Sequence, residues 1–588
     1  MRSLLWHCAL VTSTFALWPQ PKQFEHGSST LWLSPNVQLV HTSRTATSHP
    51  LEWLWTTVEK VIFSFPHNGI TPTKGQISSE TLLQSAFERM KHNVLNHSFV
   101  PGKFHARDIQ FEPATDGSKR YIEQLAIEED THNGLADTER LDKSEAYAIE
   151  VSEDGSAVIK IASPAGGLHA LETFAQLFFA HSTPNAGFYT PYAPLTVTDR
   201  PAFGHRGLNL DISRNWIPPA DVMRTIEAMA SNKLNRLHIH ATDAQSWPLE
   251  IPALPDLALK GAYSPSQIWH TEDLEAVQRH GTNYGVQVFV EIDLPGHTTS
   301  IGIAYPHLVT AKDVPWSEYA LEPPSGQLRL NSSEVPPFIE TLLTDLLPRT
   351  ARYSSLFHLG GDELNLNAYM LDPTVNSASH QVLQPLVQAF IDHVISLATS
   401  YCLTVIMWEE MVIDWNLTLP KNIIIQTWRG SDDNALTSIL NKGYRTLFGS
   451  NAHWYLDCGH GSFIDPESAN PDSPVKPPYL DYCGPYKNWR HMYAYNPVAH
   501  IPQSQRHLVV GGEAHLWGEL TDSVNLDGML WPRLAAAAEV MWSAPGKKPD
   551  ESTTRRLADM RERLVMRGVG AGVVQMEWCL RHEGGCRL

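Results

Sequence analysis

From about residue 205 to residue 513, the chain alternates between short apolar runs and longer amphipathic segments. The apolar runs have the length of strands, and the segments between them carry hydrophobic residues at helical spacing, as Val222, Ile226 and Met229 do. The expected strands are His205–Asp211, Arg236–Ala241, Val286–Ile292, Leu356–Gly360, Thr404–Trp408, Ile423–Trp428, Thr446–Ser450 and His507–Glu513. Strands that alternate with helices in this way predict an α/β fold, a (β/α)8 TIM barrel, which a helix near residues 557–565 would close.

A different pattern precedes the junction at Asp199-Arg200-Pro201. It predicts a smaller α+β domain over residues 17–198, in front of a barrel domain over residues 199–588. The expected elements are a helix through Leu82, Phe87 and Met90, strands at Ile122–Ile127, Tyr147–Val151 and Val158–Ile161, and a helix through Leu171, Phe174 and Phe178. The last two strands would form a hairpin at Asp154-Gly155. Lys119-Arg120 lies in a polar loop and is a candidate processing site, so the segment up to about residue 120 could be cleaved.

Composition narrows the classes of partner. The chain has 588 residues, which is too long for one hydrophobic core. Its 44 basic and 63 acidic residues give a formal net charge of −19, which argues against a nucleic-acid partner or an anionic membrane surface. Its 18 tryptophans favour a carbohydrate ligand, since flat indole rings cover the apolar faces of sugars.

The N-terminus resembles a secretory signal. Met1 and Arg2 precede an apolar run from Leu4 to Leu10, and Thr14-Phe15-Ala16 offers a cleavage site after residue 16. The segment is too short to span a membrane as a helix. Three glycosylation sequons, at Asn96, Asn331 and Asn416, agree with export. We therefore expect a secreted glycoprotein, extracellular or in the vacuole or cell wall.

Of the six cysteines, Cys8 would leave with the signal, so five remain. The pairings that close the shortest loops are Cys458 with Cys483 and Cys579 with Cys586. Cys402 is then expected to be a free thiol in a buried strand.

The stretch of residues 356–363, LFHLGGDE, carries the strongest chemical signal. A buried strand ends at Gly360-Gly361, which allow a sharp turn, and Asp362 and Glu363 follow at its carboxyl end, where barrel enzymes hold their catalytic groups. Two adjacent carboxylates in a recessed site can differ in pKa, so one can remain a proton donor. The alternatives are that Asp362 only caps a helix while Glu363 is solvated, or that the pair serves nucleotide hydrolysis. The chain has no G-x-x-x-x-G-K-[ST] loop, which argues against nucleotide hydrolysis.

Other expected strand ends also carry polar and aromatic residues, which predicts one functional rim. These residues are Arg206, Asp211, His240, Asp243, Glu291, Asp293, His297, Trp408, Trp428, Glu513, Trp517 and Glu519. His238-x-His240 would place two imidazoles on one strand face, as in a barrel metallohydrolase. Later strand ends offer tryptophan and carboxylate instead of further histidines and a bridging lysine. Glycoside hydrolysis accounts for the rim better, with tryptophan walls, hydroxyl-binding charges and Glu363 as the acid.

The run His358 to Glu363 resembles the H-x-G-G-D-E signature of glycoside hydrolase family 20, the β-N-acetylhexosaminidases. The resemblance extends in order over the barrel, through HRGLNLDISR from His205, KLNRLHIHATDAQSWPLEI from Lys233, VEIDLPGH from Val290, MWEEM from Met407, QTWRG from Gln426, WYLD from Trp454 and EAHLWGE from Glu513. It begins near Ser144 and is most similar to the secreted fungal branch.

The resemblance implies a role for each matching residue. Glu363 would be the general acid/base, Asp362 would steady the substrate's 2-acetamido nitrogen, and Tyr455 would bind the acetamido carbonyl. Trp408, Trp428 and Trp517 would line the pocket, and Arg206, Asp457 and Glu519 would bind sugar hydroxyls. Asp243, Asp293, His297 and His358 would support Glu363. The chain departs from many relatives at Ala244, where a second aspartate is frequent, and at Ile239, where a tryptophan is frequent.

The resemblance thus implies a secreted enzyme that releases terminal N-acetylglucosamine or N-acetylgalactosamine from chitooligosaccharides or glycans. The substrate's acetamido oxygen would act as nucleophile, with net retention. We expect no cofactor and no catalytic metal, an oligosaccharide or glycoconjugate as partner, and a candidate homodimer. The rival hypothesis is a catalytically silent sugar-binding protein that kept the pocket.

Overall fold

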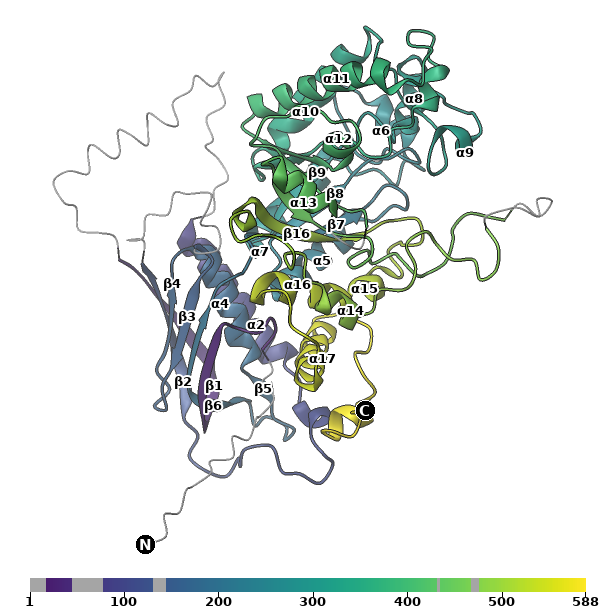
Figure 1. The fold of residues 1–588 in the computed structure, drawn as a ribbon. Helices are drawn as coiled ribbons and strands as arrows, with labels where there is room; N and C mark the ends of the chain where they lie inside the picture. The colour runs from purple at the N-terminus through teal and green to yellow at the C-terminus, as the bar shows by residue number, and fades with distance from the viewer. Residues whose placement is uncertain (1–16, 45–77, 131–143, 431–433, 467–474) are drawn as a thin grey trace, which may run out of the picture.

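The computed structural model describes residues 17–44, 78–130, 144–430, 434–466 and 475–588. Figure 1 shows an N-terminal domain, coloured purple to blue, beside a barrel that runs from teal to yellow. The expected signal segment, residues 1–16, lies outside the described residues.

Within the described ranges, the N-terminal domain contains a six-stranded sheet in the order β1-β2-β4-β3-β6-β5, and β1 also pairs with β6. The strands are β1 (Gln23–Arg44), β2 (Tyr121–Asp130), β3 (Tyr147–Val151), β4 (Ala157–Ile161), β5 (Phe179–Ala180) and β6 (Phe188–Asp199). Two helices, α2 (Ser79–His97) and α4 (Pro164–Gln176), bury their apolar faces in the same core. The predicted helices and the strands β2, β3 and β4 are confirmed.

The sequence pattern missed β1 and β6 because both interrupt the alternation that marks a strand. The pairing of β1 shifts register near Gly27 and again between Leu33 and Gln38. β6 contains Pro191 and Pro194, residues that normally argue against a strand interior.

The described barrel strands are β7 (His205–Asp211), β8 (Arg236–His240), β9 (Gln287–Glu291), β12 (Leu356–His358), β13 (Thr404–Trp408), β14 (Ile424–Gln426), β15 (Arg445–Phe448) and β16 (Val509–Leu516). All neighbouring pairs are parallel, and β16 pairs with β7 to close the barrel. Each predicted strand overlaps one of these, so the predicted TIM barrel is confirmed.

Helices follow the barrel strands along the chain, and most of them surround the barrel (Figure 1). They are α5 (Pro219–Ser231), α6 (Asp256–Gly261), α7 (Thr271–Tyr284), α8 (Thr299–Ala304), α9 (Trp316–Tyr319), α10 (Val335–Thr350), α11 (His380–Ser400), α12 (Glu410–Ile413), α13 (Asn434–Asn441), α14 (Trp489–Ala494), α15 (Leu526–Leu530), α16 (Arg533–Ser543), α17 (Glu551–Met566) and α18 (Glu577–Arg581). A short pair, β10 (Val309–Thr310) with β11 (Gln327–Leu328), lies in a loop region. Among the described helices, only α11 is long and apolar enough to cross a membrane, but it buries a stripe from Leu383 to Ala398 and contacts β13, as a barrel helix does.

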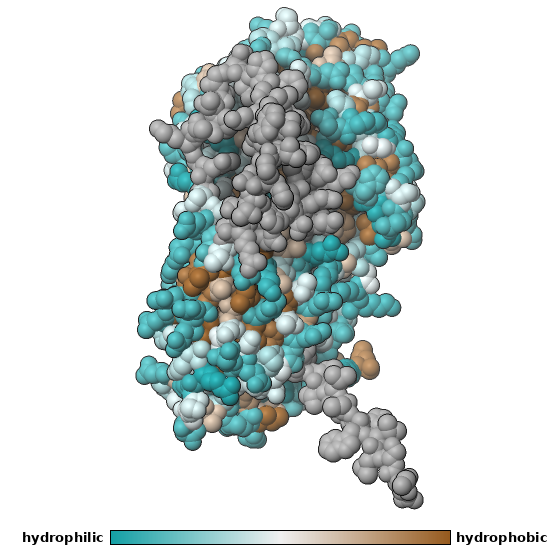
Figure 2. Space-filling view, turned by 90° about the vertical axis from the view of Figure 1, so that its left-hand side faces the viewer, coloured by the Kyte–Doolittle hydropathy of each residue, from teal (hydrophilic) through white to brown (hydrophobic). Residues whose placement is uncertain are grey.

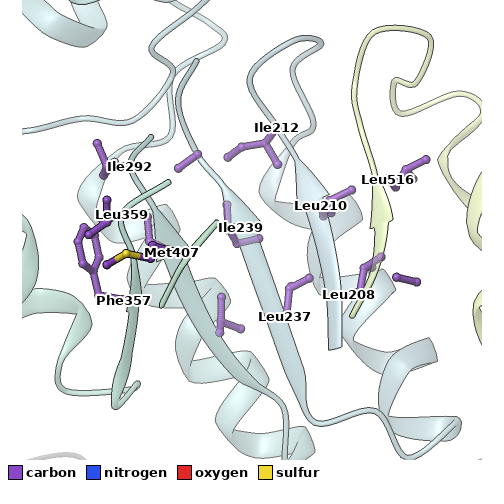
Figure 3. Packing of buried hydrophobic residues seen from close by; sticks show 14 of the residues in the cluster. Leu208, Leu210, Ile212, Leu237, Ile239, Ile292, Phe357, Leu359, Met407 and Leu516 are labelled. Atoms are coloured by element: carbon purple, nitrogen blue, oxygen red, sulfur yellow. The ribbon is translucent and has the colours of Figure 1, made fainter. Parts of the chain in front are cut away.

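Alternation along each strand decides which side chains reach the barrel interior. Leu208 and Leu210 of β7 point out towards the helices, as do Leu237 and Ile239 of β8 (Figure 3). The residues between them therefore point inward. At the amino-terminal end of the strands the interior holds an apolar layer made by Phe289, Leu356, Ile406, Ile424 and Leu447. Two positions further along four of these strands, the inward-facing residues are polar or aromatic and lie beneath the site: Glu291, His358, Trp408 and Gln426.

The helix predicted to close the barrel has a different role. α16 contacts β16 and β7, and so covers the point of closure. α17 instead reaches the N-terminal domain, where Arg563 donates hydrogen bonds to the carbonyls of Gln176 (2.8 Å) and Phe178 (3.2 Å). The apolar residues Leu557, Met560 and Leu564 of α17 still belong to the hydrophobic cluster of the barrel domain. The predicted helix is therefore present, but α16 and not α17 covers the closure.

Both predicted disulfides, Cys458–Cys483 and Cys579–Cys586, are formed. Cys402 is free, as predicted, but it is exposed rather than buried in a strand. It lies in the turn after α11 with φ 60°, one residue beyond the helix cap, so the expected location was wrong.

The surface features that bear on export and processing are accessible. Asn96, Asn331 and Asn416 are all exposed. Arg120 is exposed, whereas Lys119 is half-buried, with its ammonium 3.9 Å from the centre of the Trp32 ring. The face in Figure 2 is largely hydrophilic, with hydrophobic atoms gathered over the N-terminal domain in its lower half.

Candidate active site

The turn after β12 carries the two carboxylates and depends on its glycines. Gly360 has φ 77°, and a Cβ there would overlap the carboxylate of Asp293. The Gly361 N–H donates a hydrogen bond of 3.0 Å to Asp293 Oδ1. This close approach places Asp362 and Glu363 at the carboxyl end of the barrel, where both are half-buried.

Glu363 lies at the end of a line of alternating acidic and basic groups. Its Oε2 is 3.4 Å from Nε2 of His297, whose Nδ1 is 3.1 Å from Asp243 Oδ1. Burial alone would lower the pKa of His297, but the negative charges of Asp243 and Asp293 outweigh it and raise that pKa well above its usual range. The imidazole is therefore a charged donor beside Glu363.

Asp362 occupies a drier position than its neighbour. Burial raises the pKa of its carboxyl to about 6, with a further contribution from the carboxylates of Glu363 and Glu291, although His297 opposes the shift. Its Oδ1 is buried and has no hydrogen-bond partner among the described residues. Buried oxygens normally have a hydrogen-bond partner, so the unpaired Oδ1 of Asp362 is suited to binding a positively charged group of a ligand next to Glu363.

Four aromatic side chains form a cluster at this end of the barrel. Trp408, Tyr455 and Trp517 are buried, and Trp428 packs against them half-exposed. The rings of Trp428 and Tyr455 lie nearly parallel, with centroids 6.3 Å apart and 18° between their planes. Burial raises the pKa of Tyr455 well above its usual value, so its hydroxyl stays a hydrogen-bond donor. The cluster provides flat walls and one phenol.

Asp457 and Glu519 are the other two acidic residues predicted at the rim. Asp457 Oδ1 accepts a hydrogen bond of 3.4 Å from the N–H of Trp517, and burial raises the pKa of this carboxyl to about 7. Burial also raises the pKa of Glu519, although Arg214 opposes the shift. Asp457 thus contacts Trp517 of the aromatic cluster, and Glu519 lies within the electrostatic reach of Asp457 and Arg214.

Arg206 does not belong to this rim, which corrects the prediction. It lies near the start of β7 and on its outward side, and it is fully buried. Its guanidinium donates to both oxygens of Glu145, at 2.7 and 2.8 Å, and to the carbonyl of Lys233 at 2.8 Å. Arg206 therefore links the N-terminal domain to the amino-terminal end of the barrel, and it cannot reach a ligand at the carboxyl end.

The arginine at the rim is Arg214, just beyond β7. It contacts Asp211 (3.3 Å), Asp243 (3.0 Å) and Glu322 (2.6 Å), and Glu519 contributes to its charge environment. Arg214 lies in the same segment as Arg206, HRGLNLDISR, but the sequence resemblance assigned hydroxyl binding to the first arginine of that segment and so missed the second. Glu322 lies in the loop before β11, where no periodic pattern marks it.

The barrel interior beneath the rim holds a chain of imidazoles and carboxylates. His240 lies 2.7 Å from Asp243 and 2.6 Å from Glu291, and His238 lies 2.9 Å from Glu291 and 3.0 Å from Glu513. Despite burial, these carboxylates raise the pKa of His238 to about 9. The predicted support residue His358 has its Nδ1 3.1 Å from Glu291.

This arrangement disfavours the alternative of a metal held by His238 and His240. Each imidazole has a carboxylate near both ring nitrogens, and the raised pKa values favour the imidazolium. A protonated imidazole has no free electron pair for a metal ion.

Comparisons with known proteins agree with this architecture. Residues 203–545 match the model for "Glycosyl hydrolase family 20, catalytic domain", and residues 17–177 match "beta-acetyl hexosaminidase like". The chain is 46% identical to a "Beta-hexosaminidase" of Arthroderma benhamiae, covering 97% of each. It is 32% identical to a "Chitooligosaccharidolytic beta-N-acetylglucosaminidase" of Ostrinia furnacalis, covering 76% of this chain and 75% of that one.

A solved structure of a GH20 exo-β-N-acetylglucosaminidase from Vibrio harveyi, in complex with N-acetylglucosamine, superposes with a TM-score of 0.70 at 19% identity. It covers 96% of this chain and 79% of the other, and at this identity the likeness shows the fold. The family model and the identity to the Arthroderma protein go further: this chain belongs to glycosyl hydrolase family 20.

Proposed function

We propose that this β-N-acetylhexosaminidase removes a terminal, non-reducing N-acetylglucosamine or N-acetylgalactosamine from chitooligosaccharides or glycans, with the substrate's own 2-acetamido group as nucleophile. The observation that supports this most strongly is the position of Asp362. Its carboxyl group precedes Glu363 in the chain. It is also close enough to Tyr455 of the aromatic cluster for its negative charge to help raise the pKa of that phenol. An acetamide held there would have an anion at its nitrogen and a phenol at its carbonyl oxygen.

In the proposed reaction Glu363 donates its proton to the glycosidic oxygen as the bond to the anomeric carbon breaks. The acetamido oxygen attacks that carbon and forms a cyclic oxazolinium, whose positive nitrogen the ionised Asp362 stabilises. The Tyr455 hydroxyl donates to the acetamido oxygen and holds it in line for attack. Water then opens the ring with Glu363 as base, so the anomeric configuration is retained.

The remaining residues would bind and orient the sugar. Trp408, Trp428 and Trp517 would cover its apolar face and the acetamido methyl group. Asp457, Glu519 and Arg214 would bind hydroxyls, and Arg214 replaces Arg206 in this role. His297 and Asp243 would orient Glu363, while Asp293 and His358 would hold the turn and the strand beneath it.

The test compares aryl N-acetyl-β-glucosaminides and galactosaminides with the plain aryl β-glucoside. We expect turnover of the acetamido sugars, no turnover of the glucoside, and much tighter binding of a stable thiazoline mimic of the oxazolinium. Trapping a glycosyl ester on an enzyme carboxylate would contradict the mechanism. Binding of N-acetylglucosamine without turnover of any glycoside would instead favour the silent sugar-binding protein.

We also infer that the protein is secreted and glycosylated, and we keep the homodimer as a candidate assembly to be tested. The two disulfides and the three exposed sequons support export. Expression in a eukaryotic host, followed by endoglycosidase treatment and light scattering, tests all three points. A protein retained inside the cell, of unchanged mass after treatment and of monomer mass in solution, would contradict them.

A further inference from the structure

Glu410 is a buried carboxyl that the reaction proposed above does not use. It begins α12, two residues after Trp408 at the end of β13, and it is 5% exposed. Its Oε1 accepts a hydrogen bond of 2.8 Å from the indole N–H of Trp428. Its other oxygen, Oε2, is buried and has no hydrogen-bond partner among the described residues.

The preceding residue, Glu409, has a different environment. Its Oε1 lies 2.6 Å from Nε of Arg429, and the same guanidinium also pairs with Asp414 at 2.8 Å. Arg429 Nε is 3.6 Å from Oε1 of Glu410. The charge of Arg429 is therefore already matched by two closer carboxylates, and Glu410 has no cation of its own.

A buried carboxyl in this position is more stable with its proton than without it. Ionisation would leave a negative charge out of water near Asp362, and the nearest cation, Arg429 at 3.6 Å, is already paired more closely with Glu409 and Asp414. Burial raises the pKa of Glu410 well above its usual value, and the charges of Asp362 and Glu409 raise it further. A neutral carboxyl still accepts the Trp428 hydrogen bond through its carbonyl oxygen.

We propose that Glu410 is a positioning residue, a neutral carboxylic acid that fixes the indole of Trp428 as a wall of the sugar pocket. This inference rests on the proposed function. Trp428 is the half-exposed member of the aromatic cluster and stacks on Tyr455, so its orientation affects how the acetamido group is held. Because Glu410 is uncharged, it can lie near Asp362 without adding a repulsion that would keep Asp362 protonated.

Two substitutions of Glu410 distinguish the effect of its hydrogen bond to Trp428 from the effect of a charge on its carboxyl group. Glu410→Gln keeps a carbonyl acceptor for Trp428 and cannot ionise, so kcat/KM should stay within about threefold of the parent enzyme. Glu410→Leu removes the acceptor and should lower kcat/KM by about tenfold or more, the usual worth of one buried hydrogen bond. In a Trp428→Phe background, which lacks the indole N–H, Glu410→Leu should add no further loss.

Protein stability gives a second readout that does not depend on activity. The folded pKa of Glu410 is raised above its unfolded value near 4.5, so its contribution is complete below that value and is lost as pH rises towards the folded pKa. Glutamine has no such loss. The melting temperature of Glu410→Gln relative to the parent should therefore increase between about pH 4 and pH 8.

Glu409→Gln is the matched control, since it removes the neighbouring carboxyl and leaves Arg429 short of a partner. It should lower the melting temperature at neutral pH, where Glu410→Gln does not. A Glu410→Gln enzyme as impaired as Glu410→Leu would overturn the inference, because an ionised carboxylate would then be needed. An unimpaired Glu410→Leu would overturn it too. If the parent hydrolysed no N-acetylhexosaminide, the proposed function would fail, while the stability series would still test the neutral state of Glu410.

Discussion

The imidazole of His297 lies with its Nε2 3.4 Å from Oε2 of Glu363. Because neighbouring carboxylates raise the pKa of His297, this contact places a positive charge next to the proposed acid. The charge would stabilise the carboxylate that forms when Glu363 gives up its proton. His297 has φ 47° and Glu363 has φ 52°, so both residues adopt a left-handed backbone that is uncommon for residues other than glycine.

We predict that Glu363→Gln lowers kcat by about 10²- to 10⁴-fold on substrates with a poor leaving group, the usual range for a general acid. Glutamine preserves the shape of the side chain but cannot donate the proton. The loss should shrink for an aryl leaving group that needs no proton. Steady-state rates on a leaving-group series measure this, and an unchanged rate with the poorest leaving group would remove Glu363 from its role.

We predict a pH dependence set by Asp362, which must be ionised to stabilise the oxazolinium. Its pKa is raised to about 6, so kcat/KM should rise with pH through about that value. In Asp362→Asn the rise near pH 6 should disappear together with most of the activity. Profiles of kcat/KM for both enzymes test this, and a parent profile that is flat between pH 4 and pH 7 would contradict it.

The two arginines near the first barrel strand should differ in their effect on activity. Arg214→Ala should raise KM and lower kcat/KM, because the side chain lies at the rim, and it should also lower stability, because Asp211 and Asp243 stay buried without this cation. Arg206→Ala should leave Glu145 buried without its cation, at a cost of about 3–5 kcal/mol in unfolding free energy. Thermal denaturation and steady-state kinetics distinguish them. A stable Arg206→Ala enzyme with impaired sugar binding would restore the original assignment of Arg206.

The positions of Arg206 and Arg214 illustrate what a sequence pattern can settle. The eight barrel strands could be predicted because each is a short buried run, and the acidic pair because it follows one such run after two glycines. Whether Arg206 points inward or outward depends on the register of β7. All seven residues of β7 are buried, so its sequence shows no alternation from which that register could be predicted. Glu322 and Glu410 could not be assigned either, since their roles arise only from contacts with residues far away in the chain.

Gly360 should tolerate no side chain. Gly360→Ala would combine a positive φ, which costs alanine about 1–2 kcal/mol, with an overlap between its Cβ and the Asp293 carboxylate. We expect a lower melting temperature and a loss of activity greater than the loss of folded protein, because the turn also orients Asp362. Circular dichroism and kinetics on the same preparation check this. Gly443→Ala is a suitable control, since Gly443 also has a positive φ (77°), but a Cβ there meets no atom within 4 Å. It should share the backbone cost and keep its activity per folded molecule.

The disulfide Cys458–Cys483 should matter more for substrate binding than for the integrity of the barrel. Cys458 follows Asp457 directly, and both cysteines of this disulfide belong to the cluster that contains Tyr455 and Trp517. The two cysteines are 25 positions apart in the sequence, and replacing both by serine removes the constraint on the loop between them. We expect KM to rise about tenfold or more under conditions in which the barrel is still folded. The control is the same replacement at Cys579 and Cys586, whose loop of 7 residues' separation lies at the C-terminus. That variant should keep its KM. Equal effects of the two replacements on KM would mean that the Cys458–Cys483 link contributes only to general stability.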